Sequence, residues 1–253
     1  MPSAVALVPA RAGSRRVPRK NLIPLAGHPL IAYAIAAAQE SGVFDGVVVS
    51  TDSEEVAEVA ARYGADVPGL RPAEIATETS ADIEWVLHLM RDRREEVFSI
   101  LRPTSPFRGG ATIARAMARF CELGDAIDSI RAVELCRQHP EKMWVLEGEL
   151  IRPLLPQPEG ETPLHSRQYQ SLSKVYAQNS SLEIAWSRVL EGTLPTISGD
   201  RVAPFFSEGV EGFSIDYPSD VEAAERLVAQ GAALPCPVAK RRALKAMRRR
   251  GDG

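Results

Sequence analysis

Cationic and polar side chains follow the first apolar segment of this sequence at close spacing. The apolar segment covers 5–9, and a polar stretch of the chain follows it directly. The residues of that stretch that could do chemistry are Arg11, Gly13, Ser14, Arg15, Arg16, Arg19, Lys20 and Asn21. Glycine lets the backbone approach a ligand closely, and backbone N–H groups together with cations bind phosphate. The pattern predicts that the loop 10–21 holds the phosphates of a nucleoside triphosphate.

Alternating apolar strands and amphipathic helices must position this loop. The predicted strands are 5–9, 46–52, 97–102 and 127–133, with 175–186 and 194–198 as segments that return to the sheet. The predicted helices are 30–39, 53–64, 82–94, 111–122 and 220–230, with Ser53 as an N-cap and Gly64 as a C-cap of the second. This alternation is typical of an α/β fold with a mainly parallel sheet, in which ligands bind beyond the carboxyl ends of the strands.

Charge is distributed unevenly along the 253 residues, whose formal net charge is −3. The segment 240–253 contains seven Lys or Arg and one Asp, about +6, which leaves about −9 for the rest. We expect a single domain over 1–238, with an irregular Pro-rich excursion at about 136–178, and a basic, disordered tail at 239–253. An acidic body argues against a nucleic-acid-binding surface.

The cysteines and the apolar stretches bear on the cellular compartment. Cys121, Cys136 and Cys236 are odd in number and lack metal-site spacing, which favours a reduced, cytoplasmic protein. The longest apolar stretch, 30–38, is far shorter than the ~20 residues that span a bilayer. Arg11 comes too early for a signal-peptide apolar core. We therefore expect no membrane association.

Several blocks of the chain, taken together, resemble the acylneuraminate cytidylyltransferase family, whose members make CMP-activated sialic and related acids. The blocks are Ala10-Arg11-Ala12-Gly13-Ser14 with Lys20-Asn21, Ser50-Thr51-Asp52-Ser53, Arg71-Pro72-Ala73-Glu74, Leu101-Arg102-Pro103-Thr104-Ser105-Pro106-Phe107-Arg108, Arg167-Gln168, Asn179 and Gly212-Phe213-Ser214-Ile215-Asp216. The resemblance implies a Rossmann-like nucleotidyltransferase fold of the GT-A-like kind. It also implies a homodimer, in which the excursion reaches over the partner's active site, and Mg²⁺-dependent transfer of CMP from CTP to an acid.

The loop and the resemblance together assign roles to residues. Arg11 and Lys20 are the expected catalytic cations, Arg11 over the α- and β-phosphates and Lys20 at the leaving group. The residues expected to bind CTP are Ala10, Arg11, Gly13, Ser14, Lys20, Asn21, Arg71 and Ser80. The residues expected to bind the acceptor are Arg102, Thr104, Ser105, Arg108, Arg167, Gln168 and Asn179, and Lys142 is a further candidate. Asp216 is the expected magnesium ligand, since Mg²⁺ often takes one or two protein carboxylates together with phosphate oxygens.

The chain departs from sialic acid synthetases at two positions. It has Ser214-Ile215-Asp216 where those enzymes carry Asp-x-Asp, which removes one possible metal ligand. It has Arg102 where they usually have Gln, and a guanidinium fork suits a carboxylate or a phosphonate. Both departures bear on the acceptor and metal side of the site.

Several candidates also have a structural alternative. Asn21 either orients the loop or contacts ribose, and Asp52 either serves the nucleotide or caps a helix. Ser80 is an N-cap candidate for the third helix, and Asp220 for the last. Glu183 interrupts a buried strand, so it either pairs with an arginine or faces the pocket.

The sequence therefore predicts a cytidylyltransferase that activates a small acidic acceptor, by default a nonulosonic or other 2-keto sugar acid. The first alternative acceptor is a phosphonate. A nucleotide-sugar glycosyltransferase is the alternative of a different class, although it normally requires an intact Asp-x-Asp. A non-catalytic nucleotide-binding protein is the last alternative, if Ser214 has abolished metal binding.

Overall fold

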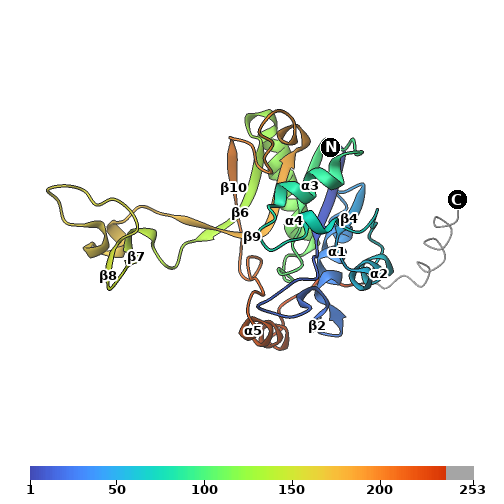
Figure 1. Ribbon diagram of the computed structural model, residues 1–253, viewed down its shortest axis with the longest axis horizontal. Helices are drawn as coiled ribbons and strands as arrows, with labels where there is room; N and C mark the ends of the chain where they lie inside the picture. The colour runs from blue at the N-terminus through green and yellow to red at the C-terminus, as the bar shows by residue number, and fades with distance from the viewer. Residues whose placement is uncertain (238–253) are drawn as a thin grey trace, which may run out of the picture. The chain divides into compact units, whose positions relative to one another are not determined.

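A six-stranded sheet forms the centre of the computed structural model, which describes residues 1–237 (Figure 1). Its strands are β1 (Ala4–Pro9), β4 (Gly46–Ser50), β5 (Val97–Ile100), β6 (Ser129–Leu135), β9 (Tyr176–Trp186) and β10 (Val202–Phe206). They lie in the order β10-β6-β9-β5-β1-β4. Strand β1 pairs in parallel with both β4 and β5, and β9 is antiparallel to β5. The predicted mainly parallel α/β architecture is confirmed, while the predicted tail at 239–253 lies outside the described residues.

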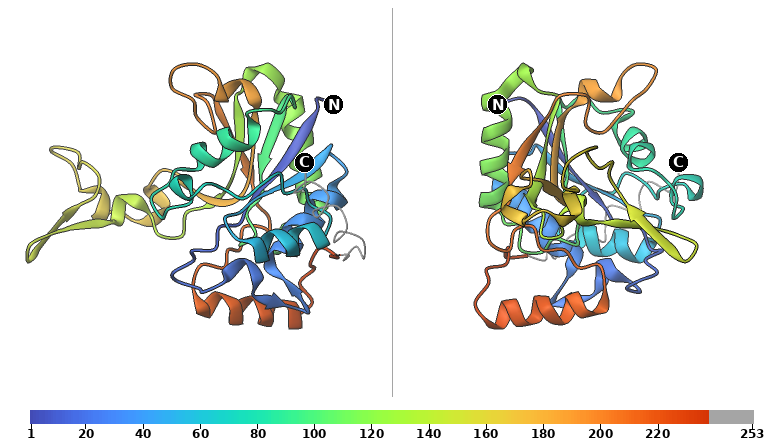
Figure 2. Two further views of the ribbon diagram at one scale, coloured as in Figure 1. Left: turned by 45° about the vertical axis from the view of Figure 1, so that its right-hand side comes forward. Right: turned by 90° about the vertical axis from the view of Figure 1, so that its left-hand side faces the viewer.

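Helices cover both faces of the sheet (Figure 2). They are α1 (Leu30–Ser41), α2 (Glu54–Arg62), α3 (Asp82–Met90), α4 (Gly110–Leu123) and α5 (Pro218–Ala229). Short 3₁₀ turns are η1 (Lys20–Leu22), η2 (Ala73–Ile75), η3 (Gly124–Ala126), η4 (Pro140–Lys142), η5 (Leu164–Ser166), η6 (Tyr169–Ser171) and η7 (Ser187–Leu190). Two small hairpins complete the elements, β2 (Pro24–Leu25) with β3 (His28–Pro29) and β7 (Trp144–Glu147) with β8 (Leu150–Pro153). The helix α5 contacts β2.

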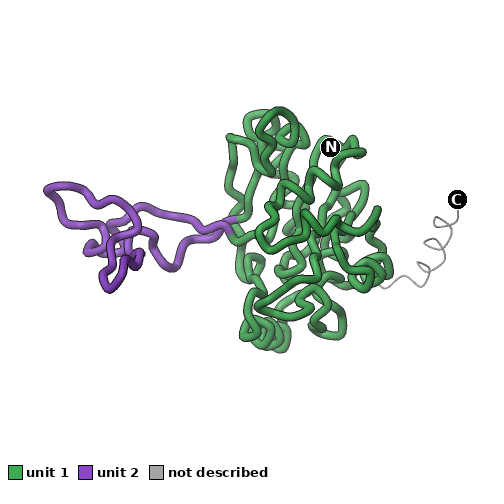
Figure 3. Tube along the Cα trace, in the orientation of Figure 1, with its two compact units in different colours: residues 1–132, 179–253 green, residues 133–178 purple. Residues whose placement is uncertain are grey.

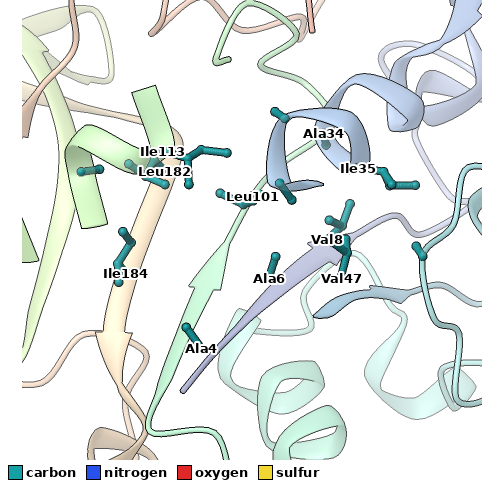
Figure 4. Packing of buried hydrophobic residues seen from close by; sticks show 14 of the residues in the cluster. Ala4, Ala6, Val8, Ala34, Ile35, Val47, Leu101, Ile113, Leu182 and Ile184 are labelled. Atoms are coloured by element: carbon teal, nitrogen blue, oxygen red, sulfur yellow. The ribbon is translucent and has the colours of Figure 1, made fainter. Parts of the chain in front are cut away.

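Side chains alternate along β1 between two of the three hydrophobic clusters of the described residues. Ala4, Ala6 and Val8 point into a cluster that contains residues of α1, α2 and α4. Val5 and Leu7 point to the other face, where α3 packs. Figure 4 shows labelled members of the first cluster, contributed by β1, β4, β9, α1 and α4, together with Leu101, which follows β5. Burial on both faces fixes the register of β1, and so it fixes where the loop at its carboxyl end begins.

Local signals in the sequence predicted some elements correctly and others wrongly. Ser53 caps α2 as expected, and its side chain accepts the N–H of Val56. The expected strand at 194–198 is wrong, because this segment turns: the Thr196 hydroxyl accepts the N–H groups of Ser198 and Gly199. The returning strand is instead β10, further along the chain.

The described residues divide into two compact units, 1–132 with 179–237 and 133–178 (Figure 3). The second unit contains the β7–β8 hairpin and the turns η4 to η6. No helix within residues 1–237 has both the length and the apolar character needed to cross a membrane.

Candidate active site

The loop that follows β1 is held in shape by two side chains of the chain itself. Asp52 accepts the N–H of Ala12 at 2.7 Å, and Asn21 donates to the carbonyl of Arg11 at 3.0 Å. Both side chains thus support the loop backbone, the first of the two roles weighed for Asn21. The helix-cap role considered for Asp52 is wrong, since Ser53 is the cap.

A tight turn after η2 anchors the guanidinium of Arg11, which donates through Nη1 to the carbonyl of Thr77 at 2.7 Å. Ser80 accepts the N–H of Thr77 and donates its own N–H to the Thr77 hydroxyl, both at 3.1 Å. The N-cap role considered for Ser80 is wrong, because α3 begins after Ala81 without a side-chain cap. Sequence reasoning singled out Ser80 but missed Thr77, although the Thr-rich run 77–80 was the available signal.

Lys20 brings this loop into contact with the predicted metal ligand. Its Nζ lies 3.1 Å from Oδ1 of Asp216, and the Ser214 hydroxyl donates to Oδ2 at 2.8 Å. Burial alone would raise the pKa of Asp216, but the bonds from Ser214 and Lys20 bring the pKa below its usual value. The carboxylate is therefore ionised at neutral pH.

The backbone around Asp216 is fixed as well. The N–H of Ile215 donates to the carbonyl of Thr104 at 2.9 Å, which joins this segment to the loop after β5. Asp220 accepts the N–H groups of Asp216 and Tyr217, each at 2.8 Å. The N-cap role considered for Asp220 is wrong, because Tyr217 is the N-cap of α5. Asp220 lies at the third helical position, where its side chain accepts the Tyr217 N–H in a capping box.

Arg71, assigned to the nucleoside side, is buried beside strand β4. It donates through Nε to the Ser50 hydroxyl at 2.9 Å and through Nη2 to the Ser50 carbonyl at 3.0 Å. Its guanidinium carbon lies 5.4 Å from the ring centre of Trp85, a cation–π contact. Burial lowers the pKa of Arg71. Its side chain thus braces the end of β4.

Arg102, the expected anion fork for the acceptor, is instead engaged by two carboxylates. Its Nη2 lies 2.6 Å from Asp82 and 3.2 Å from Glu183. Glu183, whose side chain is 3% exposed, also lies 3.1 Å from Arg131. Burial alone would lower the pKa of Arg102, but bonds to Asp82 and the charge of Glu183 raise it. The expectation that Glu183 pairs with an arginine is confirmed, and the charge of Arg102 is balanced within the protein.

Arg108 and Ser105 lie inside the protein in this conformation. Arg108 is fully buried, and its Nη1 donates to the carbonyls of Ser181 and, at 3.3 Å, Arg102. Within residues 1–237, the Arg108 Nε and Nη2 and the Ser105 hydroxyl have no hydrogen-bond partner. Burial lowers the pKa of Arg108 to about 9. The Arg108 side chain thus braces the loop after β5, and contact of Arg108 or Ser105 with an acceptor would require that loop to move.

The remaining acceptor candidates occur in both units. Asn179 donates to the Ser207 hydroxyl at 2.7 Å and lies in the larger unit. In the second unit, Arg167 lies 2.7 Å from Glu161, and Lys142 donates to the carbonyl of Arg167 at 2.6 Å. Acceptor binding by Arg167, Lys142 and Gln168 stays a prediction.

The oxygen, nitrogen and sulfur donors of the side chains determine whether the protein can bind Mg²⁺. Among residues 1–237, no three His, Cys, Asp or Glu side chains are grouped to hold a metal ion. A nucleotide-bound Mg²⁺ does not need such a group, since phosphates and water supply most of its ligands. Asp216 is ionised and its side chain is 44% exposed, so it is suited to be the single carboxylate that binds a nucleotide-bound Mg²⁺.

Known proteins match this chain over most of its length. The cytidylyltransferase family profile matches residues 5–139. The chain is 35% identical over 235 residues to the CMP-N,N'-diacetyllegionaminic acid synthase of Legionella pneumophila, across 88% of this chain and 95% of that relative. It is 42% identical over 114 residues to the N-acylneuraminate cytidylyltransferase of Escherichia coli, across 45% of this chain and 27% of that relative.

Solved structures match the fold. The CMP:2-keto-3-deoxy-manno-octonic acid synthetase complexed with CTP superposes with a TM-score of 0.65 at 16% identity, across 90% of this chain and 99% of that one. This similarity supports the fold assignment, and the family profile and the full-length relative support the family predicted from the sequence. The chain belongs to the cytidylyltransferase family and is a CTP-dependent nucleotidyltransferase.

Proposed function

We propose that this protein transfers CMP from CTP to a nonulosonic acid and releases pyrophosphate. The observation that carries the proposal is the similarity to the legionaminic acid synthase of Legionella pneumophila, which extends over 95% of that relative. The similarity therefore extends beyond the nucleotide-binding half, which supports an acceptor of the same class. The acceptor proposed here is a sugar acid of the legionaminic or sialic kind.

The loop residues supply the chemistry of the nucleotide end. An acceptor oxygen attacks the α-phosphorus of CTP, and the bond to the pyrophosphate oxygen breaks. Arg11 and Lys20 neutralise negative charge on the phosphates, and Lys20 follows the charge that develops on the leaving group. Asp52 and Asn21 hold the loop backbone in place, so little reorganisation is needed when CTP binds.

Magnesium is the proposed cofactor, and Asp216 is the residue that would hold it. When bound, the ion would withdraw charge from the phosphate oxygens and favour deprotonation of the acceptor hydroxyl. Lys20 donates to the Asp216 carboxylate at 3.1 Å and lowers its pKa, so in this proposal one cation both keeps the metal ligand ionised and binds the phosphates.

We further propose that the protein acts as a homodimer in the cytoplasm. The β7–β8 hairpin of the second unit exposes apolar side chains, with Leu146, Leu150 and Ile151 at 72%, 77% and 58%. Exposed apolar side chains gathered on one small element are typical of a protein interface. Light scattering of the purified chain tests this proposal, and a monomeric mass at micromolar concentration would contradict it.

The phosphonate alternative loses part of its support. It depended on the altered Asp-x-Asp at Ser214 and on the guanidinium fork of Arg102, and the Arg102 side chain is paired with Asp82 and Glu183. The glycosyltransferase alternative has no support from the family match. A sugar acid is therefore the acceptor class that the observations favour.

Pyrophosphate release tests the proposal directly. The enzyme is incubated with CTP, ATP, GTP or UTP, each against N,N'-diacetyllegionaminic acid, N-acetylneuraminic acid, 2-keto-3-deoxy-manno-octonic acid and 2-aminoethylphosphonate. We expect release with CTP and a nonulosonic acid. Release with the phosphonate alone would replace the proposed acceptor class, and no release with any CTP pairing would refute the proposal.

A further inference from the structure

The carboxylate of Asp216 is held through both of its oxygens by other residues of the chain. Ser214 donates to Oδ2 at 2.8 Å, and Lys20 donates to Oδ1 at 3.1 Å. An ionised carboxylate offers about four lone-pair sites, so these two bonds leave room for a further ligand. With its side chain 44% exposed, Asp216 is oriented by the protein and still accessible.

The peptide backbone on both sides of this carboxylate is also fixed. Asp220 accepts two successive N–H groups, those of Asp216 and Tyr217, at 2.8 Å each. On the other side, the fully buried Ile215 donates its N–H to Thr104. Hydrogen bonds thus hold Asp216 in place, from Ser214 to its side chain and from its backbone N–H to Asp220.

We propose that Ser214 and Asp220 are positioning residues that hold Asp216 in the orientation with which it binds a divalent cation. This inference rests on the proposed function, in which Asp216 is the metal ligand. The physical reason lies in the residue types. A carboxylate at position 214 would repel that of Asp216 whenever no metal is bound, whereas a hydroxyl donates a hydrogen bond to it. The chain therefore orients one carboxylate by a hydrogen bond rather than pairing two carboxylates around the ion.

Binding of Mn²⁺ to the complex of the full chain with CTP tests the role of Ser214. Electron paramagnetic resonance is used to follow Mn²⁺ without acceptor, so that no turnover occurs. Because side chains that orient a metal ligand are typically worth 10–100-fold in affinity, we expect Ser214→Ala to weaken Mn²⁺ binding by about 10-fold. Ser214→Thr keeps the hydroxyl and should bind Mn²⁺ within about 3-fold of wild type.

Asp220 is tested by a matched pair of variants. Asp220→Asn keeps an oxygen that can accept the two N–H groups, whereas Asp220→Ala removes it. We expect Asp220→Ala to weaken Mn²⁺ binding by about 10-fold and Asp220→Asn to restore most of the affinity. The thermal midpoint of each variant is measured alongside. A loss of Mn²⁺ affinity that followed the midpoint alone, in both variants equally, would contradict a positioning role.

The variant Asp216→Ala distinguishes a failure of the positioning role from a failure of the metal assignment. If it abolishes the Mn²⁺ signal of the CTP complex while Ser214→Ala and Asp220→Ala bind as wild type does, the positioning inference is overturned and the proposed metal ligand stands. If Asp216→Ala itself binds Mn²⁺ normally, the metal assignment in the proposed function fails, and the inference fails with it.

Discussion

The cations of the first loop and those that follow strands β4 and β5 differ in what surrounds them. Arg15 and Arg19 of the first loop have side chains 83% and 68% exposed, and each pairs with one glutamate. Arg71 and Arg108 are 7% and 0% exposed and donate to groups inside the protein. Both regions contain arginines at the carboxyl edge of the same sheet, yet their environments are opposite.

An exposed arginine can exchange its carboxylate partner for a ligand at lower cost than a buried arginine can give up its partners. An exposed ion pair is worth only about 0–1 kcal/mol, so a phosphate can replace the carboxylate at little cost. Removing a partner from a buried pair leaves an uncompensated charge and costs about 3–5 kcal/mol. Lys20 lies between these extremes, with a side chain 18% exposed and a carboxylate partner that is itself 44% exposed. This contrast agrees with the prediction that the first loop binds the ligand, whereas Arg71, Arg102 and Arg108 brace the protein.

Replacing Lys20 should have the largest effect. Lys20→Ala removes the point charge that follows the leaving group, and we expect kcat to fall by about 10²-fold or more. Steady-state pyrophosphate release is the measurement. The control is Arg62→Ala, an exposed residue in the last turn of α2. Near-normal kcat in Lys20→Ala would show that the first loop lacks the catalytic role given to it.

Arg102 offers the sharpest test of bracing against ligand binding. Arg102→Gln leaves Asp82 with the Trp85 hydrogen bond but no salt bridge, and Glu183 with Arg131. We therefore expect the free energy of unfolding to fall by about 2 kcal/mol. This value is below the full buried-pair cost because the Arg102 side chain is 22% exposed. Urea denaturation measures it. Unchanged stability combined with a raised KM for the acceptor would restore the anion fork predicted from the sequence.

The pH dependence of stability tests the same ion pair through its carboxylate. Burial alone would raise the pKa of Asp82, but bonds and charge from Arg102 bring it below the usual value. Its ionisation therefore stabilises the fold fully above pH about 4 and progressively less as the pH falls through the folded-state pKa. Asp82→Asn should lower stability by about 1 kcal/mol at pH 7. Thermal unfolding from pH 7 to pH 3 should show this difference shrinking, and a constant difference would contradict the pairing.

Replacing an exposed loop cation should have the smallest effect. Arg15→Ala removes a side chain that is 83% exposed, so we expect a change in unfolding free energy below about 0.5 kcal/mol. The KM for CTP should rise by about 2-fold at low salt, and this difference should disappear at high salt because exposed charges are screened. A stability loss comparable with that of Arg102→Gln would remove the distinction between the two groups of cations.

Features that depend on neighbouring residues could be predicted from the sequence. The Ser53 cap was predicted correctly because its side chain bonds the backbone only three residues further on. The strand β1 and the loop after it were predictable because a continuous apolar run followed by glycine and cations is a local pattern. The strand at 194–198 was predicted wrongly because strand formation depends on a partner strand, and a short apolar run does not reveal whether one is available.

The sequence by itself determined the family, the α/β fold and the residue types at the site. It also indicated that Glu183 needed a partner, since a buried carboxylate without one is costly. Only the tertiary structure decided which charges meet. Lys20 and Asp216 are 196 positions apart, and Arg102 and Glu183 are 81 apart. A sequence specifies that a side chain is charged, but its partner and its exposure depend on which distant segments the sheet and its helices bring together.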